Sequence, residues 1–377
     1  MALSVLFILI AIVAGWWLLR WGWILIRSGG ALWYLAVGMN PTLSRCLYKI
    51  EVLTERYPHG NEGLLPYRVY RPLIRSVAPA LVIYHGATPY GEEHPALDRL
   101  ARALAHAGLI VFVPRLPRLQ AVLIDETNLY SMRVFYRYIQ GHDRVLPGHI
   151  SVAGTSFAGG LLLKALLDQD MQQPQPRAVL AYGSYCDLET TLRFVLTGKR
   201  IDDGTEVSVQ PDRWAQVIFF YNYLDYIPGD FDKEAVRAVL DYYVRDQVEE
   251  GDKAKEKLSS AERRITELII TPGNPESSDL AETVLQHARR CLEDLSPSFF
   301  HSRIRFPFWV LHGRNDLMVP YTEALALKNL LPRQVRLYIT NLYSHKHLDY
   351  GDHLWRAIRD IVGLLTYFGR FLRAVGG

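Results

Sequence analysis

The stretch "ISVAGTSFAGG", Ile150–Gly160, joins two kinds of pattern within eleven residues. Its first residues form a short apolar run typical of a buried strand, and "GGLLLKALLDQ" continues from it with the composition of a buried helix. Ser156 lies at the junction, among glycine and alanine residues. A tight strand-to-helix turn favours small residues, because they let the two elements approach closely. The stretch therefore predicts the strand, turn and helix of a parallel-sheet protein.

Segments on both sides of this stretch alternate in the same way. "LYKIEVLTE" and "LPYRVYRPL" predict an antiparallel start, and "PALVIYHG" is a continuous apolar run, typical of a buried parallel strand. A helix ("HPALDRLARALAHAG"), a strand ("LIVFVP"), a helix from about Asp125 to Gly141 and a strand ("RAVLAYGS") complete the series. Repeated strand and helix units predict an α/β fold with a mostly parallel, doubly wound sheet.

The alternation stops near Cys186 and resumes at "RFPFWVLHG". The residues between them have mainly helical patterns and predict a cap over the edge of the sheet where ligands bind in such folds. The cap contains a group of aromatic residues: Trp214, Phe219, Phe220, Tyr221, Tyr223 and Tyr226. Packing in the core of the cap is the favoured role for most of them, and contact with an apolar substrate is the alternative. The last helix is expected to pack on the sheet through an apolar face made of Ile358, Ile361, Leu365, Phe368 and Leu372. The predicted domains are an anchor and linker (1–45), a first core part (46–186), the cap (187–303) and a second core part (304–377).

Residues 2–19 contain no charge and no proline. Extended to Ile26, this segment has the roughly 20 residues that cross a bilayer, and no basic residue precedes it as in a signal peptide. An uncleaved transmembrane helix is favoured over a cleaved signal and over a buried helical hairpin. Arg20, Arg27, Arg45 and Lys49 all follow the segment, which predicts a single-pass protein whose catalytic domain faces the cytoplasm.

Composition argues against several other classes of protein. A net charge of +3 with 21% charged residues, and no basic run, argues against a nucleic-acid partner. The three cysteines lack the spacing of a metal site, and "GTSFAGG" lacks the lysine of a phosphate-binding loop. No cofactor and no metal are expected.

The turn at Ser156 is where a nucleophile elbow would lie, with its hydroxyl raised above the sheet. A serine hydroxyl attacks only when a base removes its proton, and a carboxylate orients that base. Asp316 follows the apolar strand of "FWVLHGRNDLMVP", and His345 and His347 follow the strand of "VRLYITNLYSHKHLDY". The order serine, acid, histidine along the chain is the one that this architecture uses.

In these features the sequence resembles the α/β-hydrolase family, as a capped, bacterial-like member with an N-terminal membrane segment. The resemblance covers about residues 65 to 372 and rests on "YHGATP", "GTSFAGG", "LHGRND" and "SHKH". It implies that His85 and Gly86 begin an oxyanion loop with the Ala87 amide as one donor, and that the Phe157 amide is the second. The family's G-x-S-x-G begins here with Gly154 but ends with Ala158, which adds one methyl group.

Several of these assignments have alternatives. Asp187 is the alternative acid, although a carboxylate in a first helical turn has a structural role of its own. Asp316 has the alternative role of capping the helix that follows it. His345 is favoured over His347 as the base because it lies nearer the strand end. His85 is interpreted as a ring that braces the oxyanion loop.

The sequence thus predicts a serine hydrolase that cleaves a small-molecule or lipid-like carboxylic ester, or a thioester, through an acyl-enzyme. Two alternatives remain: an inactive scaffold of the same fold at the membrane, and an acyltransferase or amidase with the same triad.

Overall fold

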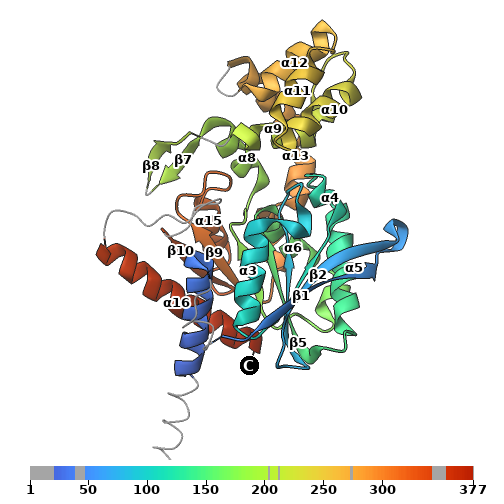
Figure 1. Cartoon of the computed structure of the whole chain (residues 1–377). Coiled ribbons are helices and arrows are strands. Elements are labelled where there is room, and N and C mark those ends of the chain that lie inside the picture. The colour runs from blue at the N-terminus through green and yellow to red at the C-terminus, as the bar shows by residue number, and fades with distance from the viewer. Residues whose placement is uncertain are drawn as a thin grey trace, which may run out of the picture.

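The structure is a computed structural model that describes residues 21–38, 47–202, 204–210, 213–271, 275–341 and 354–376. Its centre is an eight-stranded sheet in the order β1-β2-β4-β3-β5-β6-β9-β10 (Figure 1). β2 pairs antiparallel with β1 and β4, and the other neighbours pair in parallel. The strands are β1 (Ile50–Pro58), β2 (Leu64–Pro72), β3 (Ala78–Tyr84), β4 (Ile110–Pro114), β5 (Val145–Thr155), β6 (Val179–Tyr182), β9 (Phe308–Gly313) and β10 (Val335–Thr340). The predicted mostly parallel sheet with an antiparallel start is confirmed.

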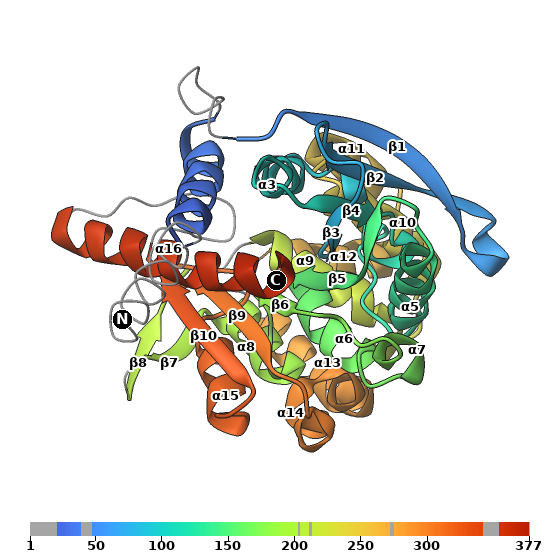
Figure 2. The ribbon, with the colours of Figure 1, turned by 90° about the horizontal axis from the view of Figure 1, so that it is seen from below.

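Helices cover both faces of this sheet. Leu81 and Ile83 of β3 belong to one apolar core, with α3 and α16, whereas Val82 belongs to the other, with α5 and α6. Every residue of β3 is buried, which explains its continuous apolar run. Figure 2 shows α3 and α16 on one side of the sheet and α5 and α6 on the other. The core helices are α3 (Pro95–His106), α4 (Pro117–Gln120), α5 (Thr127–Gln140), α6 (Phe157–Ala165), α7 (Gln169–Gln172), α15 (Thr322–Leu330) and α16 (Leu354–Gly376), with single 3-10 turns at Gly60–Glu62 and Gly91–Glu93.

The insertion between β6 and β9 extends above the sheet in Figure 1. Its helices are α8 (Leu188–Thr197), α9 (Arg213–Tyr223), α10 (Lys233–Val244), α11 (Val248–Lys255), α12 (Ser260–Ile270), α13 (Pro275–Leu295) and α14 (Pro297–Phe300), with 3-10 turns at Leu224–Tyr226 and His301–Arg303. A two-stranded hairpin, β7 (Lys199–Asp202) and β8 (Thr205–Ser208), was not anticipated. Its strands are too short and polar to show an alternating pattern. Gly198, with φ of 68°, ends α8 just before it.

The aromatic residues of α9 form the cap's own core. Phe219 and Phe220 are fully buried with ring centroids 4.8 Å apart, and Tyr221 and Tyr223 are buried beside them. Trp214 Nε1 donates to the Val244 carbonyl at 2.8 Å. The favoured interpretation, core packing, is confirmed for most of the set, and Tyr226 remains 36% exposed.

The predicted inward face of the last helix is wrong in its first half. Phe368 and Leu372 are buried, but Ile358 and Ile361 are 40% and 44% exposed. The first turns of α16 extend past the edge strand β10, so they have no sheet to cover (Figure 1).

Residues 21–37 form a helix that packs against α16. A Cβ atom placed on Gly29 would lie 3.6 Å from Leu365 Cδ2, and the Arg373 guanidinium stacks on the Trp21 ring at 5.1 Å. Among the residues described, no helix combines the length and apolarity needed to span a bilayer. Residues 1–20, on which most of the predicted membrane segment falls, lie outside the described residues.

Candidate active site

Four parallel strands have their carboxyl ends at the same edge of the sheet, where β9 and β10 extend two residues further than β5 and β6. Thr155 of β5 is in register with Tyr182 of β6, Tyr182 with Leu311 of β9, and Leu311 with Tyr338 of β10. Residues that directly follow these positions therefore lie along one edge. Ser156 belongs to this edge, and the loop that carries Asp316 leaves from it.

Ser156 is held in a backbone conformation that L-residues rarely adopt, with φ of 53° and ψ of −131°. Its amide donates to the Tyr182 carbonyl at 2.8 Å, and α6 begins at the next residue. Such strain is kept only where the surrounding structure enforces it, and it occurs mainly at functional sites. The sharp turn expected of a nucleophile elbow is present.

Glycine is required at two positions around this turn. A Cβ atom on Gly154 would lie 2.5 Å from the Ala158 carbonyl oxygen, and one on Gly159 would lie 2.5 Å from Ser184 Cβ. The methyl group of Ala158 itself is fully buried in the apolar core. The close approach that excludes a side chain is thus at Gly159, one residue beyond the family's last glycine, which explains why alanine fits at 158.

The loop after β3 passes directly beside Ser156. A Cβ atom on Gly86 would lie 3.0 Å from Ser156 Cβ and 3.6 Å from its Oγ, so the loop packs tightly against the serine side chain. Neither the Ala87 amide nor the Phe157 amide donates a hydrogen bond to any of the described residues. Two backbone donors thus remain available, one in α6 next to Ser156 and one next to Gly86.

His85 fixes the course of this loop. Its Nε2 accepts a hydrogen bond from the Leu116 amide at 3.1 Å, so the ring proton is on Nδ1, which donates to the Gly86 carbonyl at 2.8 Å. Desolvation by burial lowers the pKa of His85 to about 4 and keeps the ring neutral.

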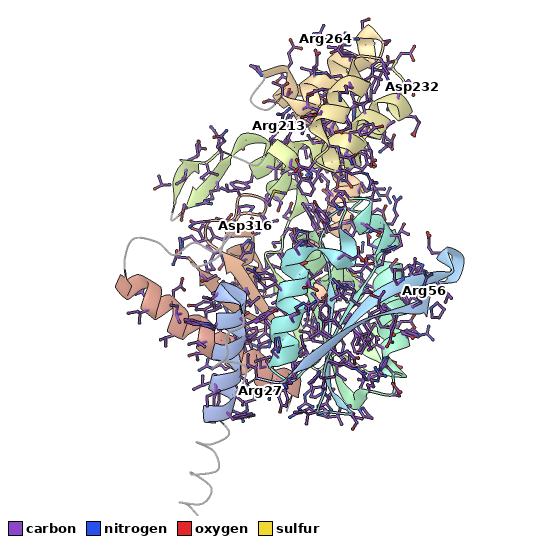
Figure 3. The ribbon with its side chains drawn as sticks, in the orientation of Figure 1. Arg27, Arg56, Arg213, Asp232, Arg264 and Asp316 are labelled. Carbon is purple, nitrogen blue, oxygen red and sulfur yellow. The ribbon has the colours of Figure 1, made fainter. Side chains whose placement is uncertain are left out.

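Asp316 is fully buried in the turn that follows β9 (Figure 3). Its Oδ1 accepts from the amides of Met318 at 2.8 Å and Val319 at 2.9 Å. It does not cap α15, whose N-cap residue is Tyr321. The ring of His312, also fully buried, has Nε2 3.7 Å from Asp316 Oδ2 and 2.9 Å from the Val319 carbonyl, which accepts its proton.

Asp187, the alternative acid, has a structural role for each carboxylate oxygen. Oδ1 accepts from the Glu189 and Thr190 amides at 2.9 and 3.2 Å as the N-cap of α8. Oδ2 accepts from Ser298 Oγ at 2.7 Å. Both carboxylate oxygens therefore have structural partners, and Asp187 acts as a helix cap.

His345 and His347 lie outside the described residues. The segment that leads to them is described as far as Asn341, and there the Arg314 amide donates to the Thr340 carbonyl at 2.8 Å. The chain therefore leaves β10 alongside the loop that carries Asp316.

Two buried carboxylates near the site were missed in the sequence. Glu92, 1% exposed, accepts from Nε and Nη2 of Arg115, the residue before Leu116. Glu323 of α15 accepts from the amides of Cys186 and Asp187 at 2.9 and 2.8 Å, and burial raises its pKa. Each pair joins residues distant in sequence, and no local pattern marks them.

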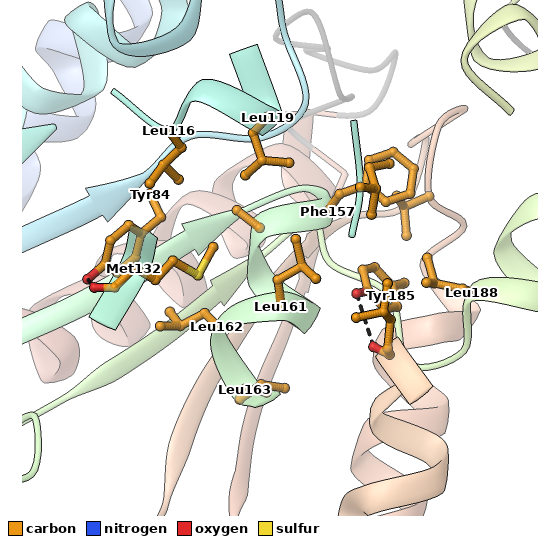
Figure 4. Packing of buried hydrophobic residues seen from close by; sticks show 14 of the residues in the cluster. Tyr84, Leu116, Leu119, Met132, Phe157, Leu161, Leu162, Leu163, Tyr185 and Leu188 are labelled. Atoms are coloured by element: carbon orange, nitrogen blue, oxygen red, sulfur yellow. Dashed lines mark hydrogen bonds between the residues drawn. The ribbon is translucent and has the colours of Figure 1, made fainter. Parts of the chain in front are cut away.

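Apolar packing fixes the helix that follows Ser156. Figure 4 shows Phe157 and Leu161 among buried side chains that include Leu119 and Tyr185. The Tyr185 hydroxyl donates to the Leu295 carbonyl at 3.2 Å and so ties the end of α13 to the core. The described residues contain no group of His, Cys, Asp and Glu side chains placed to hold a metal ion.

No protein-family model matches the chain, and no curated protein sequence matches it. Several solved structures are similar at low identity. Acylaminoacyl peptidase from Pyrococcus horikoshii is 15% identical with a TM-score of 0.49, over 87% of this chain and 43% of that one. Dipeptidyl peptidase 4 from Porphyromonas gingivalis is 12% identical with a TM-score of 0.45, over 87% and 35%. The 2-hydroxy-6-oxo-6-phenylhexa-2,4-dienoate hydrolase from Rhodococcus is 17% identical with a TM-score of 0.42, over 84% and 99%.

The chain spans less than half the length of the two peptidases. The chain has an α/β-hydrolase-like fold. Its strand order, its helical insertion after β6 and its strained serine turn indicate this fold.

Proposed function

We propose that this chain is a serine hydrolase that cleaves a carboxylic ester through an acyl-enzyme on Ser156. The observation that carries the proposal is the left-handed backbone of Ser156 with the Gly86 loop against its side chain. A serine in an ordinary turn has no need of this strain or of a loop with a free amide beside it.

The attack uses groups from three strand ends. Asp316 is the acid, and His345 is the base, with His347 as the alternative. The base accepts the Ser156 proton as Oγ attacks the carbonyl carbon, and then gives it to the leaving alcohol. Water attacks the acyl-enzyme with help from the same ring. Oδ1 of Asp316 already accepts two amides, so Oδ2 is the oxygen that accepts the imidazole proton.

The Ala87 and Phe157 amides hold the oxyanion. As the carbonyl carbon becomes tetrahedral, negative charge gathers on its oxygen beside the Ala87 and Phe157 amides. The Phe157 amide also lies at the N-terminus of α6, where the helix dipole favours negative charge. His85 and the Glu92–Arg115 pair keep the loop in place.

The cap lies over this edge and selects the substrate. Lipid-derived esters and thioesters are further members of the proposed substrate class, although the buried aromatics of α9 no longer argue for an apolar acyl chain, because they pack on each other. We further propose that the uncharged segment 2–19 anchors the protein as a single membrane pass, with the hydrolase domain in the cytoplasm. The uncharged segment 2–19 and the arginines that follow it support this.

The test is labelling of the purified full chain with a fluorophosphonate, which modifies activated serines, followed by mass spectrometry of the labelled peptide. Wild type is expected to be labelled on Ser156, and Ser156→Ala to be unlabelled. Ser184→Ala is the matched control, since Ser184 is buried beside the same turn and makes no hydrogen bond in the described part of the chain.

His345→Ala and His347→Ala identify the base, because only one of them should lose labelling. An ester series with a matched amide then separates esterase from amidase. A folded wild-type protein that stays unlabelled while a small ester probe reaches the site would disprove the hydrolase and favour a scaffold.

A further inference from the structure

Six arginines gather at the end of the sheet opposite Ser156. Two grooves with volumes of about 990 and 220 Å³ lie there, at the amino ends of the parallel strands. The larger contains Arg177, just before β6, and Arg336, at the start of β10. The smaller contains Arg75 and Pro79, at the start of β3. Figure 3 shows Arg27 at this end of the molecule and Asp316 toward the cap.

These arginines have no carboxylate partner among the residues that the structure describes. The set is Arg27, Arg75, Arg177, Arg336, Arg370 and Arg373. None of them forms an ion pair among the described residues, and no aspartate or glutamate is among the described residues that line either groove. Other arginines of the chain do find carboxylates, as Arg115 does with Glu92 and Arg193 with Glu282. An array of uncompensated positive charge is complementary to an anionic surface.

Aromatic rings hold part of this array in place. The Arg336 guanidinium lies 4.9 Å from the Trp309 ring centroid, and that of Arg373 lies 5.1 Å from Trp21. Arg177 Nε donates to the Ala374 carbonyl at 3.0 Å. Guanidinium groups fixed in this way bind phosphate oxygens without losing much freedom.

Exposed apolar side chains lie in, or next in sequence to, the segments that line the smaller groove. Trp23, which lines the smaller groove, is 47% exposed, and Ile74, next to Arg75 in the β2–β3 turn, is 79% exposed. Leu73, Val77 and Ile26 are exposed as well. Arginines beside exposed tryptophan and aliphatic side chains are typical of a surface that lies on lipid headgroups.

We propose that this arginine surface, made of the six arginines with Trp23 and Ile74, docks on an anionic lipid bilayer and binds the phosphates of its headgroups. The occupant is a bilayer rather than a soluble anion, because the apolar side chains need an apolar partner as much as the arginines need a negative one. The position fits, since Trp21 and Trp23 line the grooves and come just after the uncharged segment 2–19 and Arg20.

The arginine surface and the proposed catalytic edge lie at opposite ends of the parallel strands. A bilayer on the arginine surface leaves the cap and Ser156 on the far side, so a substrate would arrive from the aqueous phase. Docking and catalysis then depend on separate residues and can fail separately.

The experiment measures the thermal midpoint, Tm, of the full chain in nonionic detergent micelles. The micelles contain phosphatidylglycerol or phosphatidylcholine, and a further arm adds free glycerol phosphate. A ligand that binds only the folded state raises Tm. Wild type is expected to gain about 3 °C with phosphatidylglycerol alone, and most of this gain should vanish at about 0.5 M salt.

The double variant Arg336→Gln/Arg370→Gln should lose most of the gain, measured from its own Tm in plain micelles. The control Arg303→Gln/Arg305→Gln removes two exposed arginines that line neither groove and should keep it. Both variants should keep fluorophosphonate labelling at Ser156, which separates this test from the proposed hydrolase.

Four results would overturn the proposal. They are no gain in wild type, an equal gain with phosphatidylcholine, an equal gain with glycerol phosphate, and a full gain in the Arg336→Gln/Arg370→Gln variant. A lipid-independent dimer that loses its contacts in that variant would assign the surface to a second copy of the chain instead.

Discussion

Ser156 shows how a few atoms constrain the chain around a reactive group. Its backbone is strained, and a Cβ atom on Gly154 or Gly159 would clash with neighbouring atoms, while one on Gly86 would lie 3.0 Å from Ser156 Cβ. The two carboxylates considered as the catalytic acid differ in their burial and in their hydrogen bonds. Asp316 is fully buried with two amides on one oxygen, whereas Asp187 uses both oxygens to cap α8.

Asp316→Asn is predicted to lower kcat for an ester substrate by about 10³- to 10⁴-fold, because an amide cannot hold the imidazole in its working tautomer. Asp187→Asn should keep kcat within about threefold, because asparagine caps a helix as well as aspartate does. Steady-state kinetics of both variants on one ester checks this. The reverse ranking would make Asp187 the acid.

The cap is joined to the core by specific hydrogen bonds from α9. Asn222 Oδ1 accepts from the Ile124 amide at 2.7 Å, and its Nδ2 donates to the Val122 carbonyl at 2.8 Å. Val122 itself has φ of 58°, so the loop between α4 and α5 takes a course that the cap helps to hold. This contact fixes α9 relative to the loop.

Asn222→Ala is predicted to reduce the free energy of unfolding by about 1–3 kcal/mol, because the Ile124 amide and Val122 carbonyl lose their partner. Faster proteolysis within the cap should accompany the loss. Asn222→Asp keeps the acceptor for Ile124 and should fall between wild type and Asn222→Ala. Urea unfolding and limited trypsin digestion measure both effects, and a wild-type profile for Asn222→Ala would show that other contacts hold the cap.

Buried histidines make the stability of the whole molecule depend on pH. Desolvation by burial lowers the pKa of His59, His85, His106 and His142, and His85 is the most buried of them. In each case the unfolded chain binds a proton at a pH where the folded chain does not. Acid therefore favours unfolding, and the free energy of unfolding rises with pH through this range.

For His85 the relevant interval runs from its folded pKa of about 4 to its usual value near 6.5. Its contribution, about 3 kcal/mol, is fully present above pH of about 6.5 and is lost as the pH falls to about 4. His85→Gln should therefore show a shallower fall in the free energy of unfolding over that interval than wild type. Urea unfolding at a series of pH values measures the two slopes, and equal slopes would contradict the burial of a neutral His85.

Much of the fold was predictable because it depends on local patterns. Continuous apolar runs marked β3, β4, β5 and β9, and helical runs marked α3, α5 and α6 to within a few residues. The serine turn was predictable for the same reason, since small residues between a strand and a helix are a local feature. The β7–β8 hairpin and the exposed first half of α16 were not, because a short polar strand has no pattern and exposure depends on where the sheet ends.

Interactions between distant parts of the chain were decided only by the tertiary structure. Four examples join segments that no spacing relates: the hydrogen bond from Leu116 to His85, the pairing of Glu92 with Arg115, the hydrogen bond from Ser298 to Asp187, and the gathering of six arginines that form no ion pair with the described residues. A sequence records which side chains are available and how the nearby backbone turns. Which of them meet depends on how the sheet and its layers bring separate segments together.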